Sequence, residues 1–269
     1  MSLIQALILG IVQGLTEFLP VSSDGHLVLV PFIVGWPEPS LTFIVSTHIG
    51  TLAALLWVFR ARVIEIIRAV IGGPGREPDR RLAGLIVIGT VPGAVLGGIF
   101  ASRVETTFER PVIAILLLGV TGWALLAAES SYEERKEEPR PEGALTPMDA
   151  GLIGLAQATA ILPGISRSGT TIATGMLRGI SRENAARFSF LLAIPITIGA
   201  VIVKIPDMID EGASGAGGAM ALGVLTSAVT GVLAIQAMLA LVKRRGLRPF
   251  GVYCFFAMTA GLLTALARG

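Results

Sequence analysis

The chain alternates long apolar runs with short polar segments, and the lengths of these runs predict membrane-spanning helices. A helix needs roughly 20 apolar residues to cross the hydrocarbon core of a bilayer. Six runs reach that length, and few charged residues lie inside them. They are found near 41–59, 82–101, 111–128, 185–205, 218–242 and 249–267.

Two further apolar segments, 3–35 and 148–177, are broken in the middle by a polar block that follows a Leu-Pro pair. Proline ends the preceding helix because it lacks an N–H and restricts the residue before it. The residues after each proline, 22–24 and 166–168, are typical of N-caps that open a second helix. Each segment is therefore predicted to be a re-entrant hairpin, which enters and leaves the membrane on one side.

In chain order, each half consists of one hairpin followed by three spans. Pro20 and Pro163 are equivalent in this scheme, and Thr, Leu, Pro and Ser recur at matching spacing around both. We therefore predict an all-α integral membrane protein, an inverted-topology repeat with six transmembrane helices and two re-entrant helical hairpins. The predicted divisions are a first repeat 1–128, a solvated cytoplasmic linker 129–147 and a second repeat 148–269.

Composition agrees with this layout. Of 269 residues, 53% are hydrophobic and 15% are charged, and the mean hydropathy is +0.76. Such a chain is too apolar for a soluble domain of this size. Its single cysteine, Cys254, excludes a disulfide framework and a cysteine metal site. The first residues have no basic region and no cleavage site, so we expect no signal peptide.

The basic residues set the expected orientation. Loops on the cytoplasmic side of membrane proteins carry an excess of Lys and Arg. Basic residues gather in the segments 60–81, 178–187 and 243–248, whereas the loop near 206–217 is acidic. With both broken segments treated as re-entrant, the three basic loops fall inside the cell and the acidic loop falls outside.

The second polar block has the composition of an anion site. If the two hairpin tips meet, two helix N-termini direct their free N–H groups at one spot. Arg167 adds a planar donor fork that suits phosphate oxygens. The alternative is that Arg167 only pairs with a buried carboxylate such as Glu17 or Asp24. The remaining candidate contacts to the anion in this block are Ser166, Ser168, Gly169, Thr170 and Thr171.

The first polar block carries acid–base groups. Gln13 and Glu17 are four residues apart and share one helical face. Glu17 is suited to bind Mg²⁺ or Ca²⁺ through oxygen, or to act as a base. Ser23 and His26 are three residues apart on the next helix, which places a nucleophile near a proton-transfer partner. The alternative is a purely structural pair, and the hydroxyl of Ser22 adds a further candidate substrate contact.

The two blocks differ where the chemistry lies. At equivalent positions Glu17 matches Ala160, and Asp24 matches Arg167. This asymmetry favours an enzyme over a transporter, whose halves could stay alike. His48 is the only other histidine and lies within a predicted span. We expect it to make a structural hydrogen bond, with a supporting role in the site as the alternative.

Both blocks closely resemble the two motifs of the undecaprenyl-diphosphate phosphatase family, the bacitracin-resistance proteins. The matching residues are 13–26 and 162–171, and the resemblance extends through 185–195 and the spacing between the motifs. It covers essentially the whole chain.

The resemblance implies a multi-pass enzyme of the bacterial plasma membrane that acts on its extracytoplasmic face. It would remove the terminal phosphate of a polyprenyl diphosphate, which regenerates the monophosphate carrier used in cell-wall synthesis. The family pattern assigns essential roles to Glu17, His26 and Arg167 and makes Ser23 the proposed nucleophile. It also implies a divalent cation, Mg²⁺ or Ca²⁺, at Glu17.

The implied partners are the lipid substrate and the surrounding membrane lipid, with no nucleic acid; a homodimer is left open. Ser166 and Thr171 match hydroxyl positions of the second motif. Gln13 stands where the family often has glutamate, and Asp24 stands where a small uncharged residue is usual. Whether the attacking group is serine or water, and whether the base is glutamate or histidine, is left open.

Two other classes were compared with this interpretation. A polyprenyl-phosphate flippase or transporter also fits inverted repeats with broken helices at the midplane. It predicts movement of the lipid without release of phosphate. A lipid phosphatase that forms a phosphohistidine needs two motif histidines, and neither His26 nor His48 lies in such a motif.

Overall fold

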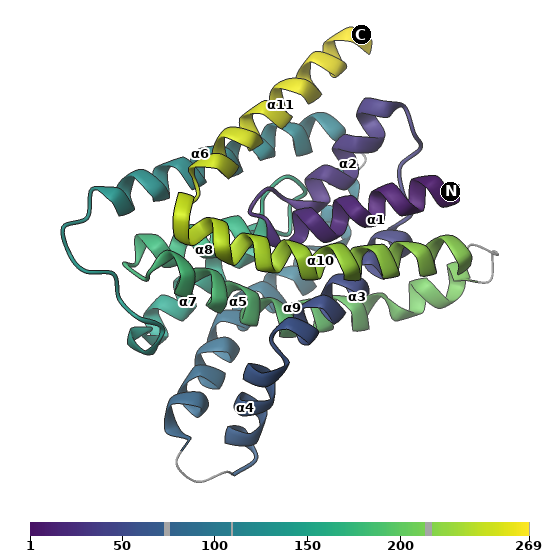
Figure 1. The fold of residues 1–269 in the computed structure, drawn as a ribbon. Helices are drawn as coiled ribbons and strands as arrows, with labels where there is room; N and C mark the ends of the chain where they lie inside the picture. Colours follow the sequence, from purple (N-terminus) through teal and green to yellow (C-terminus); the bar gives the residue numbers. More distant parts are fainter. Residues whose placement is uncertain (73–75, 109, 213–216, 269) are drawn as a thin grey trace.

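The computed structural model describes residues 1–72, 76–108, 110–212 and 217–268, and these ranges are helical apart from turns and one isolated bridge. Figure 1 shows the arrangement. The helices are α1 (Leu3–Phe18), α2 (Ser23–Val34), α3 (Leu41–Val58), α4 (Arg60–Val70), α5 (Glu77–Phe108), α6 (Pro111–Glu133), α7 (Pro147–Thr159), α8 (Arg167–Leu177), α9 (Arg182–Gly212), α10 (Gly217–Arg245) and α11 (Arg248–Arg268), with a short 3₁₀ turn, η1 (Glu142–Ala144).

Six helices within the described ranges are long and apolar enough to cross a membrane, which confirms the predicted all-α membrane protein. They are α3, α5, α6, α9, α10 and α11, and they correspond one to one with the six apolar runs. Two of them begin earlier than the apolar runs, α5 at Glu77 and α9 at Arg182. Polar residues at a membrane surface can continue a helix, so apolar length alone sets these starts too late.

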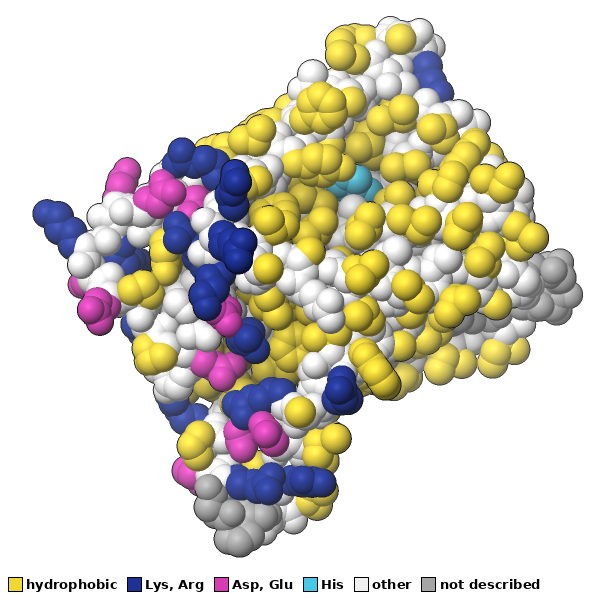
Figure 2. All heavy atoms as spheres, in the orientation of Figure 1, with side chains coloured by type: hydrophobic (Ala, Val, Ile, Leu, Met, Phe, Trp, Pro, Cys, Tyr) yellow, Lys and Arg dark blue, Asp and Glu magenta, His cyan; other side chains and the backbone are white. Residues whose placement is uncertain are grey.

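Charged side chains gather at one end of the molecule, around α4 and the segment between α6 and α7, while the rest of the face in Figure 2 is largely hydrophobic. The segment after α3, expected to be a basic loop, forms the helix α4. Its Arg62 pairs with Asp79 at the start of α5, with 2.7 Å between Nη1 and Oδ1. Of the acidic loop near 206–217, residues 213–216 and several side chains lie outside the described residues.

Each broken segment forms two helices joined by a turn at its proline. In the first hairpin, α1 ends at Phe18 and α2 begins at Ser23; in the second, α7 ends at Thr159 and α8 begins at Arg167. None of these four helices is among the six candidate spans.

The halves pack reciprocally, with the first helix of each hairpin lying on a long helix of the other half. Helix α1 lies along α10, where Gly10 is so close that a Cβ there would stand 2.0 Å from Oγ1 of Thr226. Helix α7 lies along α5, where a Cβ on Gly154 would stand 2.4 Å from the carbonyl oxygen of Gly89. This is the pairing that an inverted repeat requires. The exact divisions at residues 128 and 147 stay a prediction.

The linker between the halves is ordered against the second hairpin, which its interpretation as a solvated loop did not anticipate. Arg140 pairs through its main chain with the loop 179–181, and its Nη2 lies 2.9 Å from Oδ2 of Asp149. Arg178 Nε donates to the other carboxylate oxygen at 2.7 Å. Burial opposes ionisation of Asp149, but the hydrogen bonds from Arg178, the Thr146 main chain and the second arginine outweigh it and hold its pKa well below the ordinary value.

Candidate active site

The tips of the two hairpins touch, and an ion pair joins them. Nη2 of Arg167 donates to Oε1 of Glu17 at 2.6 Å. Oγ of Ser168 donates to the carbonyl oxygen of Leu19 at 3.1 Å. The expected meeting of the carboxylate and guanidinium is therefore present. The same contact also fits the alternative weighed from the sequence, in which Arg167 only pairs with a buried carboxylate. This pair by itself therefore does not identify a ligand.

Ser22 joins the tip of the first hairpin to the tip of the second through hydrogen bonds of its hydroxyl. Its Oγ accepts a hydrogen bond from the main-chain N–H of Gly164 at 3.2 Å and donates to the carbonyl oxygen of Ile165 at 3.4 Å. On the second tip, Thr121 of α6 donates to the carbonyl oxygen of Gly164 and accepts from the N–H of Ser166. These bonds satisfy main-chain groups of an irregular turn at membrane depth, where an unpaired group is costly.

Glu17 is the centre of the polar network. Oγ of Ser23 donates to its Oε2 at 2.6 Å, and Nε2 of Gln13 donates to the same oxygen at 3.1 Å. Because Oε1 is bonded to Arg167, both carboxylate oxygens are engaged. A carboxylate bonded directly to a serine hydroxyl is positioned to take that hydroxyl's proton.

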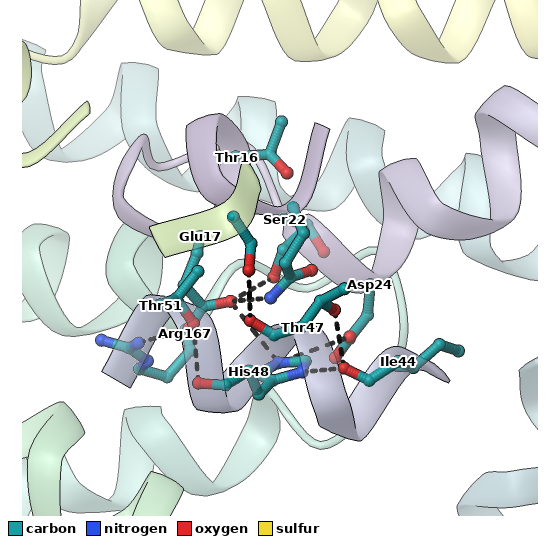
Figure 3. Close-up of polar contacts among 12 residues, drawn as sticks. Thr16, Glu17, Ser22, Asp24, Ile44, Thr47, His48, Thr51 and Arg167 are labelled. Carbon is teal, nitrogen blue, oxygen red and sulfur yellow. Dashed lines mark hydrogen bonds and ion pairs between the residues drawn. The ribbon is translucent and has the colours of Figure 1, made fainter. Parts of the chain in front are cut away.

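His48 faces this network, as Figure 3 shows. Its Nδ1 donates to the carbonyl oxygen of Ile44 at 2.9 Å. Its Nε2 lies 3.5 Å from Oε2 of Glu17 and 3.9 Å from Oδ1 of Asp24. His48 therefore has both roles weighed from the sequence, the structural hydrogen bond and the place beside the site. In the sequence, the feature that pointed to a functional role for His48 was its place as an ionisable residue inside an apolar span.

His26 points elsewhere. Its Nδ1 donates to the carbonyl oxygen of Ser22 at 2.8 Å, and its Nε2 lies 2.9 Å from the hydroxyl of Tyr253 on α11. Both ring nitrogens are thus engaged away from Ser23, and the structure does not bring together the Ser23–His26 pair expected from their spacing. The three-residue spacing places two side chains on one face but does not fix where each one points.

The second hairpin contributes hydroxyls in two groups. Ser166 caps α8 by accepting from the N–H of Gly169 at 3.0 Å, and it lies 3.3 Å from Oγ of Ser168. Thr170 donates to the carbonyl oxygen of Ser166, and Thr171 bonds Ser189 of α9 at 2.7 Å. Neither threonine lines the cavity described next, so their bonds hold the tip in shape.

A cavity of about 530 Å³ opens at the meeting of the hairpins. Its polar part comes from the hairpins and α3, and its remaining wall comes from small and apolar residues of α5 and α9. Of the sequence-predicted site residues, Glu17, Ser22, Ser23, Ser166, Arg167 and Ser168 line it. Gln13 and His26 do not appear in the wall.

Four buried polar atoms at or beside the cavity have no hydrogen-bond partner: Nη1 of Arg167, Oδ1 of Asp24, Oε1 of Gln13 and Oε1 of Gln157. Buried polar atoms in proteins are nearly always bonded, so such atoms indicate partners brought by a ligand or by water. The free guanidinium nitrogen suits an oxyanion. Among the described residues there is no group of three or more His, Cys, Asp or Glu that could hold a metal ion.

The fold and this site define an integral membrane protein with a charged polar network at a partly apolar cavity. Residues 6–260 match the model of the family described as bacitracin resistance protein BacA. The chain is 43% identical to undecaprenyl-diphosphatase 2 of Stutzerimonas stutzeri over 94% of each chain. It is 39% identical to the undecaprenyl-diphosphatase of Moorella thermoacetica over 99% of this chain and 97% of that one. An undecaprenyl-diphosphatase of Geobacter sulfurreducens is 41% identical over the full length of both chains. The chain belongs to the bacitracin resistance protein BacA family.

Proposed function

We propose that this protein is a membrane phosphatase that hydrolyses undecaprenyl diphosphate to undecaprenyl phosphate and inorganic phosphate. The observation that carries this proposal is the joint of the two hairpins, where Ser23, Glu17 and Arg167 meet at a cavity wall. The relatives named undecaprenyl-diphosphatase in Stutzerimonas stutzeri and Geobacter sulfurreducens match over 94% and 100% of this chain. The product returns the lipid carrier to cell-wall synthesis, which is the basis of bacitracin resistance.

The contacts support attack by Ser23 on the terminal phosphorus. As the Oγ–P bond forms, Glu17 takes the hydroxyl proton across their 2.6 Å hydrogen bond, and the bond to the lipid monophosphate breaks. Water then hydrolyses the phosphoserine. The alternative is direct attack by a water molecule that Glu17 deprotonates. Release of phosphate by Ser23→Ala at the wild-type rate would rule out the serine route.

Arg167 supplies the positive charge for the transferring group. One nitrogen of its guanidinium is bonded to Glu17, while the buried Nη1 has no partner. Phosphoryl transfer depends mainly on positioning and on stabilising charge on the phosphoryl oxygens. Nη1 is therefore the expected donor to the diphosphate, assisted by the hydroxyls of Ser166 and Ser168 in the same wall.

The residues present fit a divalent cation that is completed by substrate. Mg²⁺ in phosphate enzymes is often held by one or two protein carboxylates together with substrate phosphates and waters. Glu17 and Asp24 supply two carboxylates at the cavity, and Oδ1 of Asp24 has no hydrogen-bond partner. A bound Mg²⁺ or Ca²⁺ would neutralise charge on the diphosphate oxygens. His48 lies close to both carboxylates and holds their spacing.

The other wall of the cavity suits a lipid. On α5 it includes Gly93, Ala94 and Gly97, and on α9 it includes Gly199 and Ala200. Small residues leave room for a chain between two helices, and an apolar lining removes that chain from water. An amphiphile with a phosphorylated head and a hydrocarbon chain therefore matches both parts of the cavity.

The cavity lies toward the end of the molecule that is opposite the charged end. Helices α5 and α9 begin at the charged end, and Gly98 and Lys204 in the cavity wall are roughly 30 Å along these helices. Basic residues mark the cytoplasmic side. We therefore propose that the protein lies in the plasma membrane and that its active site opens on the extracytoplasmic face.

The decisive experiment measures inorganic phosphate released from undecaprenyl diphosphate by the purified protein in detergent. Wild type is expected to release phosphate in the presence of Mg²⁺ or Ca²⁺, and Glu17→Gln and Arg167→Ala are expected to release almost none. Transfer of labelled polyprenyl phosphate across proteoliposomes, without any phosphate release, would overturn the proposal in favour of a transporter.

A further inference from the structure

The residue that precedes Ser23 has an unusual backbone. Ser22 has φ 69° and ψ 100°, and it is the one non-glycine residue with positive φ in the part of the chain that the structure describes. L-residues rarely adopt such angles, and they persist only where surrounding contacts impose them. The equivalent cap of the second hairpin, Ser166, has an ordinary φ of −78°. The strain is therefore confined to the hairpin that carries the serine nucleophile.

His26 contacts the main chain of Ser22 twice. Its main-chain N–H and its Nδ1 both contact the carbonyl oxygen of Ser22, at 3.1 and 2.8 Å. A carbonyl oxygen only accepts, so Nδ1 must carry the proton. In a neutral imidazole Nε2 is then an acceptor, and the hydroxyl of Tyr253 donates to it across 2.9 Å. The two rings also lie nearly parallel, with 5.6 Å between centroids and 9° between planes.

We infer that Tyr253 and His26 are positioning residues for the nucleophile, an inference that rests on the proposed function. The phenol of Tyr253 selects the Nδ1–H tautomer of His26, and this tautomer holds the carbonyl of Ser22. The held backbone directs Oγ of Ser23 at Glu17 and keeps Oγ of Ser22 on the second hairpin. Neither His26 nor Tyr253 lines the cavity, so neither needs to touch substrate. We call this chain of contacts the Tyr253–His26–Ser22 bracket.

Tyr253→Phe removes only the hydroxyl and keeps the ring. It is expected to lower kcat about tenfold, the size found when a metal-bound histidine loses its outer hydrogen bond, and to leave KM within about twofold. The chain has one other tyrosine, Tyr132, whose ring packs on Arg182 at the charged end. Tyr132→Phe is the matched control and is expected to match wild type. Equal turnover by Tyr253→Phe and wild type would overturn the inference.

Substitutions at His26 separate positioning from proton transfer. The side-chain NH₂ of an asparagine stands near the place of Nδ1, so His26→Asn can still donate to the Ser22 carbonyl, whereas His26→Ala cannot. If His26 positions the backbone, His26→Asn is more active than His26→Ala, keeps the wild-type pH profile, and gains no further defect from Tyr253→Phe. If His26→Asn is as inactive as His26→Ala, His26 is the proton acceptor and the inference fails.

A spectroscopic readout works without any turnover. With only two histidines, the ¹⁵N signals of the imidazoles can be assigned by comparison with His48→Gln. The Nδ1–H tautomer of His26 is expected in wild type, and a mixture of tautomers in Tyr253→Phe. An Nε2–H tautomer in wild type would overturn the bracket even if the phosphatase activity were confirmed. An inactive wild type with the expected tautomer would instead overturn the proposed function alone.

Discussion

The two hairpins share a shape and differ in chemistry. Both have a proline turn and a serine that caps the second helix, and both begin with a capping box, Ser2 with Gln5 in α1 and Thr146 with Asp149 in α7. The first hairpin brings the Glu17 carboxylate and the Ser23 hydroxyl bonded to it, and the second brings the Arg167 guanidinium. A duplicated hairpin can thus bring two capped helix N-termini to one place. The unlike side chains of the two hairpins then give that place its chemistry.

The largest expected effect comes from breaking the joint between the hairpins. Glu17→Gln removes the carboxylate that accepts the hydrogen bond from Ser23, and Arg167→Lys keeps a charge but loses the planar fork. We expect kcat to fall about 10²–10³-fold for each, the size found for lost electrostatic contacts in active sites. Phosphate release in detergent checks both.

The matched controls are Glu183→Gln and Arg187→Lys, an exposed pair on α9 near the charged end with 2.9 Å between its charged atoms. Such surface pairs contribute little. If the control variants lose as much activity as the variants at the joint, the loss reflects general damage to the protein.

The next largest effect is a loss of stability at Asp149, in the first turn of the second hairpin. Asp149 is fully buried and ionised against two arginines, whereas Gln5 at the equivalent place in α1 is neutral and exposed. Asp149→Asn should cost about 1.5–3 kcal/mol of stability at neutral pH, the range for hydrogen bonds to a charged group. Gln5→Ala should cost far less.

The same carboxylate predicts a pH dependence with a definite sign. Because folding lowers the pKa of Asp149, its contribution is complete above the ordinary value of 3.8 and is lost as the pH falls below it. Thermal unfolding in detergent should show the wild-type and Asp149→Asn midpoints separated by a constant amount from neutral pH down to about pH 4, and converging as the pH falls further below 3.8. Parallel curves would contradict the assignment.

A smaller effect distinguishes the two caps. Ser166→Ala loses an N-cap and should cost about 1 kcal/mol. Ser22→Ala loses a cap and the bonds to Gly164 and Ile165, and it leaves alanine at positive φ, so we expect about 2–3 kcal/mol. Unfolding midpoints under one condition test this, and equal midpoints would show that the caps are equivalent.

The smallest expected effect is that of His48→Gln, because His48 lies 3.5 and 3.9 Å from the two carboxylates of the first hairpin. His48→Gln keeps a donor near Nε2 and should retain activity within about threefold, whereas His48→Ala should lose about 10–100-fold. If His48→Gln is as defective as His48→Ala, His48 carries a proton rather than holding the carboxylates.

Much of the fold could be predicted because bilayer thickness and proline leave few choices. Apolar length located all six spans, and Pro20 and Pro163 located both turns. The contact of Glu17 with Arg167 followed from two caps facing one spot. The direction of His26 did not follow, because its partner Tyr253 lies on α11 and helical spacing carries no information about distant helices. The ordered linker depends in the same way on arginines that meet Asp149 only after folding.

The reciprocal packing of the halves has a consequence for biogenesis. Helix α1 leaves the ribosome first, but α10, the helix that covers its glycine face, is synthesised only near the end of the chain. During most of translation the first hairpin must therefore wait in the bilayer without its partner. Final packing of the first hairpin is therefore a late step, after nearly every span has been synthesised.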